Sequence, residues 1–413
     1  MDINKTNIKS ALKSIFLYLL TGILCGALGT LFSKAIALVT DIRTQHSFII
    51  YFLPLVGLLI VFMYDKLKVT GVGTNQVIKN CTGEAELSPL ITPAIFLGSA
   101  ISHLFGASVG REGAALQLGG GLASFLSRTF KLDATKKQIL TYCGMAGLFS
   151  AVFGTPFAAF VFTLQIAYVW KIRLNAVLPT LVSSISAYLV AIILGAHAER
   201  FTIGIIPSLS STLILKVIIL SSLSAVVAML FCYSIECFEN LFEKLFKNPY
   251  FRIVAGGVIT VFITVLLKNN DYNGAGVHII ENIFENGTFK AEAFFIKLVL
   301  TCIAVASGYK GGEIVPTLFI GATFGSLIAS LIGLPVAFGA AVGMTALFSG
   351  VTNCPIAAIV LSLELFSGSG AVYMIIASII SYALSGNISL YSAQKPYKLI
   401  KPFKYFKKYP KNT

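Results

Sequence analysis

Two glycine-rich turns in the chain each carry a glutamate that is followed directly by a long apolar segment. The first turn is Gly110-Arg111-Glu112-Gly113, and the second is Gly311-Gly312-Glu313. An ionisable side chain is costly inside hydrocarbon and is therefore usually functional there. A helix N-terminus lowers this cost, because its free N–H groups and its dipole stabilise negative charge. The same position suits a carboxylate or an inorganic anion, and we expect the two to compete for it.

Simpler explanations exist for both glutamates. Glu112 could only cap its own helix, and Glu313 could be paired permanently with Lys310, an explanation of nearly equal weight. Arg111 either neutralises the first turn locally or lies at its aqueous mouth. The glycines on each side of Glu112 let the backbone approach the pathway closely.

The composition indicates a protein that crosses a membrane several times. Of the 413 residues, 56% are hydrophobic and 12% are charged, and the mean hydropathy is +0.85; a soluble domain has about 25% charged residues. The net charge of +14 would suit nucleic-acid binding, but we reject this because the excess lies at the two ends of the chain. The basic ends contain Lys5, Lys9, Lys13, Lys395, Lys398, Lys401, Lys404, Lys407, Lys408 and Lys411. By the positive-inside rule, both termini are predicted to be cytoplasmic, in a multi-pass protein of the plasma membrane.

Apolar segments recur along almost the whole chain. Several are shorter than the roughly 20 residues that a full crossing needs, and Gly or Pro interrupts them. Short, broken helices at matching positions of two halves indicate a substrate site near the middle of the membrane. The segments are expected at about 8–40, 47–64, 91–106, 112–127, 134–153, 156–169, 174–196, 211–245, 250–267, 292–306, 314–332, 335–350, 354–367 and 371–386.

An internal repeat relates the two halves of the chain. Residues 144–152 (GMAGLFSAV) are matched by residues 343–351 (GMTALFSGV), and the alignment continues without a gap to Pro156 and Pro355. One glycine–glutamate turn lies upstream of each copy. We therefore predict an all-α polytopic membrane protein made of two transmembrane repeats, residues 1–205 and 206–413. The polar stretch 269–290 is expected to be an exposed loop.

Other classes of function find little support in the sequence. The seven cysteines have no zinc-like or CxxC spacing, and no nucleophile lies beside a base, so we predict no enzyme, no metal and no cofactor. A receptor or scaffold would need a large soluble domain. The run Gly119-Gly120-Gly121 lacks the GK[ST] ending of a phosphate loop and indicates close helix packing. Glu364, near a helix end, is interpreted as a structural partner of backbone or lysine.

Three motifs resemble those of the CLC family of chloride channels and anion/proton exchangers, in the right order and over nearly the full chain. Glu112 matches the gating glutamate of that family, and residues 311–316 (GGEIVP) match its second anion-site turn. Tyr391, in Leu390-Tyr391-Ser392-Ala393, matches the tyrosine that faces the central anion site. The resemblance implies two inverted-topology repeats with broken and re-entrant helices, and a homodimer with one pathway per subunit.

Departures from the chloride motifs resemble the fluoride-exporting branch of this family. Chloride-selective members read Gly-Arg-Glu-Gly-Pro, whereas Ala114 follows Gly113 here, and the turn Gly71–Gln76 lacks the serine and proline of their Gly-Ser-Gly-Ile-Pro turn. The run at 308–313 (GYKGGE) is also unlike the chloride pattern. The resemblance to this branch implies a residue with a hydroxyl group at position 315, where this chain has Val315 instead. Phe319 matches a phenylalanine along the fluoride pathway.

The resemblance implies a fluoride/proton antiporter that exports fluoride while a proton enters. The second, internal glutamate of the chloride exchangers has no counterpart, since no acid occurs between Asp133 and Glu199, and Glu112 and Glu313 are left as candidate proton carriers. A chloride/proton antiporter or a passive anion channel of the same fold is the alternative. The selectivity position aligns with Thr74 or Asn75. The expected anion-binding set is Gly73, Thr74, Asn75, Gly110, Arg111, Gly113, Val315, Phe319 and Tyr391.

Overall fold

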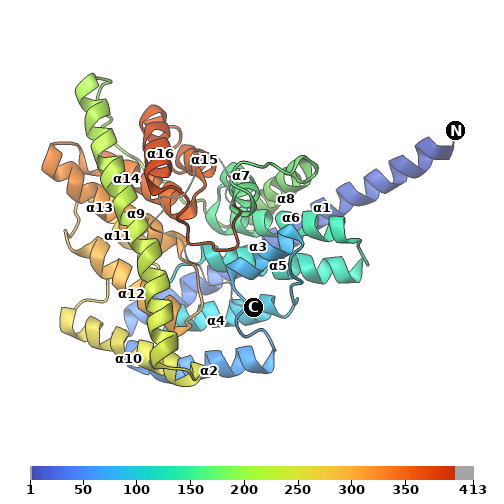
Figure 1. Ribbon diagram of the computed structural model, residues 1–413, viewed down its shortest axis with the longest axis horizontal. Helices are drawn as coiled ribbons and strands as arrows, with labels where there is room; N and C mark the ends of the chain where they lie inside the picture. Colours follow the sequence, from blue (N-terminus) through green and yellow to red (C-terminus); the bar gives the residue numbers. More distant parts are fainter. Residues whose placement is uncertain (1, 396–413) are drawn as a thin grey trace.

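The computed structural model describes residues 2–395, with side chains from residue 13, and Figure 1 shows that the chain is built of helices. These residues form sixteen α-helices and one 3₁₀ helix, without a β-strand. The lysines from Lys398 to Lys411, on which the prediction of a basic tail partly depends, lie outside the described residues. The helices are α1 (Asp2–Gln45), η1 (Ser47–Phe52), α2 (Leu53–Lys66), α3 (Thr74–Thr82), α4 (Ile91–Leu104), α5 (Glu112–Thr129), α6 (Ala134–Phe153), α7 (Pro156–Ala167), α8 (Leu174–Ile193), α9 (Ser211–Leu245), α10 (Pro249–Leu267), α11 (Val277–Asn286), α12 (Ala293–Ser307), α13 (Ile314–Ile332), α14 (Val336–Thr352), α15 (Pro355–Leu365) and α16 (Ala371–Ser385).

The apolar segments predicted from the sequence correspond closely to these helices. The segments 134–153, 211–245 and 314–332 coincide with α6, α9 and α13 at both ends. In the described part of the chain, six helical stretches are long and apolar enough to cross a membrane. Others, such as α4, α7 and α15, are shorter, so the prediction of short apolar helices among the long ones is confirmed.

Two helices lie where turns or loops were expected. The prediction of an exposed loop over 269–290 is wrong in both halves. In the first half, Tyr272 and Asn273 are buried. In the second half, α11 buries Ile280 and Ile283 in the main hydrophobic core. Similarly, α3 follows the turn at Gly73 and buries Val77 and Ile78. Both helices are short and polar on one side, so neither forms the continuous apolar run by which the other helices were recognised.

The two halves lie side by side and repeat one packing pattern (Figure 1). In the first half α1, α6 and α8 pack together, and in the second half α9, α14 and α16 do so. The contacts of α5 with α6 and of α13 with α14 are equally close, because glycines face each other. A Cβ added at Gly119 would lie 2.0 Å from the carbonyl oxygen of Gly144, and one at Gly321 would lie 2.7 Å from that of Gly343. This confirms the packing interpretation of the glycine run.

The equivalent helices α7 and α15 cap each other's N-termini. The carboxylate of Glu364, on α15, accepts hydrogen bonds from the N–H groups of Phe157 and Ala158 at 3.2 and 2.6 Å. In return, the side-chain oxygen of Gln165, on α7, accepts from the N–H of Ala357 at 2.8 Å. Both residues occupy corresponding positions in their helices. Glu364 is therefore a structural partner of the backbone, as predicted.

Candidate functional site

The two glycine–glutamate turns lie directly against each other. The N–H of Gly110 donates to the carbonyl oxygen of Gly312 at 2.6 Å, and the N–H of Gly312 donates to that of Gly110 at 2.7 Å. Only glycine fits at this contact, because a Cβ added at Gly312 would lie 2.3 Å from the backbone nitrogen of Gly113. The pairing brings the N-termini of α5 and α13 to one point, so two positive dipole ends converge there.

Glu112 is the first residue of α5 and is fully buried. Its carboxylate accepts hydrogen bonds from the backbone N–H of Arg111 at 3.2 Å and from Nε of Arg111 at 3.1 Å. Among the described residues it accepts none from the first-turn N–H groups of Gly113 or Ala114. The carboxylate is therefore held by the side chain and the N-cap N–H of Arg111 at the start of α5, and it leaves the N–H groups of Gly113 and Ala114 free of its own oxygens. Of the two expectations for Arg111, local neutralisation is the one that fits.

Glu313 precedes α13 and has no comparable partner. Its buried Oε2 accepts no hydrogen bond from any described residue. Lys310 instead places its ammonium group 4.4 Å from the centre of the Tyr64 ring, and within the described chain no ion pair joins Lys310 to Glu313. The alternative explanation, a permanent pair with Lys310, is therefore wrong. A Cβ added at Gly113 would lie 3.1 Å from Oε2 of Glu313, so the second carboxyl group lies beside the first turn.

A third group of residues joins the selectivity turn to the last turn of the chain. After Gly73, α3 begins with Thr74, whose hydroxyl accepts from the side-chain amide of Gln117 on α5 at 3.2 Å. The side-chain oxygen of Asn75 accepts from the N–H of Ala393 at 3.1 Å. Tyr391 is buried beside this contact, and its hydroxyl has no hydrogen-bond partner among the described residues. The hydroxyls of Tyr64 and Tyr142 are buried without a partner as well, so the position of Tyr391 beside the turn, and not the missing partner alone, makes it a candidate for binding an anion.

Val315 and Phe319 occupy successive turns of α13. Val315 is buried against the first glycine–glutamate turn, since a Cβ added at Gly110 would lie 3.1 Å from its Cβ. Phe319 is fully buried, and the ammonium group of Lys297 lies 5.2 Å from the centre of its ring. The ring of Tyr272 meets Phe319 edge-on, with 6.5 Å between the centroids. Both predicted pathway residues therefore face the interior, and Phe319 is next to a buried cation.

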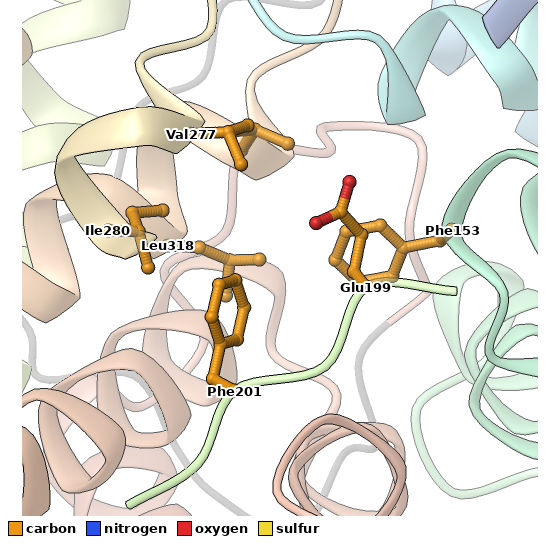
Figure 2. Close-up of a pocket in the computed structure, with 7 residues that line it drawn as sticks. Phe153, Glu199, Phe201, Val277, Ile280 and Leu318 are labelled. Atoms are coloured by element: carbon orange, nitrogen blue, oxygen red, sulfur yellow. The ribbon is translucent and has the colours of Figure 1, made fainter. Parts of the chain in front are cut away.

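Glu199 belongs to the same site, although no motif in the sequence singles it out. It lies in the loop after α8 and forms an ion pair with the guanidinium group of Arg111. Figure 2 shows its carboxylate at a small pocket of about 10 Å³, roughly the least space that holds one water molecule. The other residues that line the pocket are Phe153, Phe201, Val277, Ile280, Val315 and Leu318. Arg111 and Glu199 are 88 positions apart, so no local pattern could have linked them.

Comparison with known proteins identifies one family. The sequence model of the voltage gated chloride channel family matches residues 56–386. A chloride/fluoride channel protein from Pseudomonas syringae pv. tomato is 31% identical over 384 residues, which cover 91% of this chain and 85% of that protein. An H(+)/Cl(-) exchange transporter, ClcA, from Vibrio cholerae is 27% identical over 392 residues, with 86% and 82% covered.

Solved structures agree with this assignment. The crystal structure of a CLC-type fluoride/proton antiporter superimposes with a TM-score of 0.90 at 29% identity, covering 94% of this chain and 98% of that one. A slow cyanobacterial Cl-/H+ antiporter, 19% identical, shares the fold with a TM-score of 0.78 over 91% of this chain and 95% of that one. These matches confirm the all-α CLC-type membrane fold. The chain belongs to the voltage gated chloride channel, or CLC, family.

Proposed function

We propose that this protein is a fluoride/proton antiporter, which exports fluoride from the cytoplasm while a proton enters. The proposal rests chiefly on the convergence of the N-termini of α5, which begins at Glu112, and of α13, which begins directly after Glu313. The names of two relatives support it: one is a chloride/fluoride channel protein, and one is a CLC-type fluoride/proton antiporter. Transport makes and breaks no covalent bond in the substrate, so no enzymatic chemistry and no cofactor are needed.

The binding site we propose for fluoride lies between the two helix N-termini and the last turn of the chain. Fluoride is small and holds its water tightly, so the protein must offer close hydrogen-bond donors in exchange. The free N–H groups of α5 and α13 are such donors, and the hydroxyl of Tyr391 lacks a protein partner. Gly73, Thr74 and Asn75 form the wall on the α3 side. Val315 and Phe319 line the route along α13.

In this proposal Glu112 is both the gate and the proton carrier. As a carboxylate it competes with fluoride for the helix N-terminus. When fluoride occupies that position, the displaced carboxylate lies near another anion in a medium of low dielectric constant, and both conditions favour its protonation. Proton uptake is thus tied to fluoride occupancy, and the two ions move in opposite directions. Glu313, with one oxygen free of protein partners, serves as a second proton station.

The arrangement in the membrane is also proposed. We propose two inverted repeats, residues 1–205 and 206–413, with both termini in the cytoplasm and a homodimer in the plasma membrane. The reciprocal capping of α7 and α15 supports the repeats, because it is what a two-fold relation between halves would produce.

The direct test is anion efflux from liposomes that contain the purified protein. Vesicles loaded with fluoride or with chloride are compared side by side, with an anion electrode outside and a pH dye inside. We expect much faster fluoride efflux, accompanied by proton uptake. Equal efflux of both anions would favour the alternative, a chloride/proton antiporter, which is the function that the name of the ClcA relative states. Fluoride efflux without proton movement would favour a passive channel.

A further inference from the structure

Arg111 is shared between two carboxylates. Its Nε contacts Oε1 of Glu112 at 3.1 Å, and its Nη2 forms the ion pair with Glu199. The Glu112 side chain is 0% exposed, whereas those of Arg111 and Glu199 are 16% and 17% exposed. A single guanidinium group thus connects the buried gate to an acid that solvent can reach, and the trio carries one net negative charge.

Backbone hydrogen bonds hold the loop that carries Glu199. The N–H of Glu199 donates to the carbonyl oxygen of Phe153, at the end of α6, at 3.3 Å. Two residues later, the N–H of Phe201 donates to the carbonyl oxygen of Leu365, at the end of α15, at 2.9 Å. The loop is therefore attached to both halves of the protein. Neither of these backbone hydrogen bonds involves Glu112.

Glu199 lies on the side of the molecule that the C-terminal end of α1 reaches. Helix α1 runs across to Gln45, and Arg43 in its last turn lies against Gly274, where an added Cβ would be 2.8 Å from Nη2. Shortly after Gly274, α11 begins, and its residues Val277 and Ile280 border the pocket of Glu199 (Figure 2). With a cytoplasmic N-terminus, as proposed, Glu199 faces the outside, from which the proton enters.

We propose that Glu199 is a positioning residue for the gate, which holds Arg111 whenever Glu112 binds a proton and leaves the guanidinium group. This inference rests on the proposed antiport. Without Glu199, departure of a neutral Glu112 would leave Arg111 as a largely buried cation without a partner, which is costly. In addition, the negative charge of Glu199 favours the neutral form of Glu112, because two like charges near one site disfavour each other.

Among the residues that the structure describes, other charged groups lie near the trio of Arg111, Glu112 and Glu199 but form no ion pair with Arg111. Glu281 on α11 is exposed and close enough to act on Arg111 and Glu199 through space. His103 on α4 is close enough to Arg111, and to Arg43 and Lys297, for their charges to act on it. Arg200 donates to the main-chain oxygen of Glu199, and Glu313 lies across the Gly110–Gly312 contact. In the described part of the chain, only Glu112 and Glu199 form ion pairs with Arg111.

The test is fluoride-driven proton uptake into liposomes, measured as a function of external pH. The variants are Glu199→Gln, which keeps the shape and removes the charge, and Glu199→Asp, which keeps the charge. For Glu199→Gln we expect the pH of half-maximal exchange to fall by about one unit, because Glu112 then needs more acid to become protonated. Glu199→Asp should keep the wild-type midpoint at a rate several-fold lower. Glu281→Gln is the matched control, with a shift below about 0.3 unit, because its charge is exposed and screened.

A wild-type pH midpoint in Glu199→Gln would overturn the inference. If that variant does not yield folded protein, Glu199→Asp decides, and either a shifted midpoint or an unchanged rate contradicts the positioning role. The wild type in the same experiment distinguishes a failure of the proposed antiport function from a failure of the proposed role of Glu199. If the wild type shows no exchange at all, the proposed function fails. If it exchanges and the variants behave like it, only the role of Glu199 fails.

Discussion

The two glycine–glutamate turns share a local design but differ in their surroundings. In the first turn the neighbouring basic residue, Arg111, folds back and holds both oxygens of Glu112 through its side chain and its backbone. In the second turn the basic residue, Lys310, points away to the ring of Tyr64, and Oε2 of Glu313 is left without a protein partner. Glu112 is the first residue of α5, whereas Glu313 is the residue just before α13, so the two turns place an ion-paired carboxylate and an unpaired carboxyl oxygen at neighbouring but not corresponding positions.

This difference suggests that the two glutamates have different roles in proton transfer. An ion-paired carboxylate has a definite charged position, which it can exchange for a neutral position elsewhere. A buried carboxyl group without a counter-ion is costly to ionise, so the protonated form is favoured. Such a group can hold a proton without moving. We therefore assign movement to Glu112 and a stationary proton site to Glu313.

The largest effect is expected from breaking the contact on which both turns depend. Gly312→Ala would place a Cβ 2.3 Å from the backbone nitrogen of Gly113, and backbone cannot move aside as a flexible side chain can. We expect a loss of stability of at least about 3 kcal/mol, at the upper end of overpacking effects, seen as a large drop in thermal stability in detergent. Gly73→Ala is the stability control, since an added Cβ there meets nothing within 4 Å. Wild-type stability of Gly312→Ala would contradict this picture of the contact.

The next largest effect concerns the unpaired carboxyl group. Glu313→Gln removes the ability to carry a proton but keeps the size of the side chain. We expect proton uptake to fall at least about tenfold, as is usual when a proton-transfer group is removed, while fluoride binding persists. Coupled transport at the wild-type ratio would instead make Glu313 a structural residue and would contradict its role as a stationary proton site.

A moderate effect is expected at the last turn of the chain. Tyr391→Phe deletes the hydroxyl that has no protein partner. If fluoride is its partner, binding should weaken by about 0.5–1.5 kcal/mol, or up to about 3 kcal/mol if the charge of the anion is fully felt. Calorimetric titration with fluoride measures this loss. Unchanged affinity would exclude Tyr391 from the site.

The smallest effect is expected for Glu364, a half-buried acid of the second half. Glu364 caps α7, and in the corresponding position Gln165 caps α15 with a neutral amide. Glu364→Gln should therefore cost only about 1 kcal/mol of stability and leave proton coupling intact. Coupled transport in liposomes checks this, and loss of coupling would show that proton carriage is not confined to the paired turns.

The sequence predicted most helices because each is a separate apolar run between Gly or Pro residues. It missed α3 and α11, whose apolar residues occupy only one side of a short helix. It also indicated the two turns correctly, since an acid before an apolar helix is a local pattern. Their mutual contact through Gly110 and Gly312 is not local, and neither is the ion pair between Arg111 and Glu199. For Lys310, nearness in the sequence suggested a pair with Glu313 that the direction of the side chain rules out.

The central claim is that one side chain, Glu112, both competes with fluoride and carries the proton. The most direct test is fluoride-driven proton uptake into liposomes, measured together with fluoride efflux for the wild type and for Glu112→Gln. The glutamine cannot compete as an anion and cannot carry a proton. We predict that Glu112→Gln abolishes proton uptake, whether or not fluoride still passes. If the variant still moves protons against their gradient at the wild-type ratio to fluoride, the mechanism is contradicted.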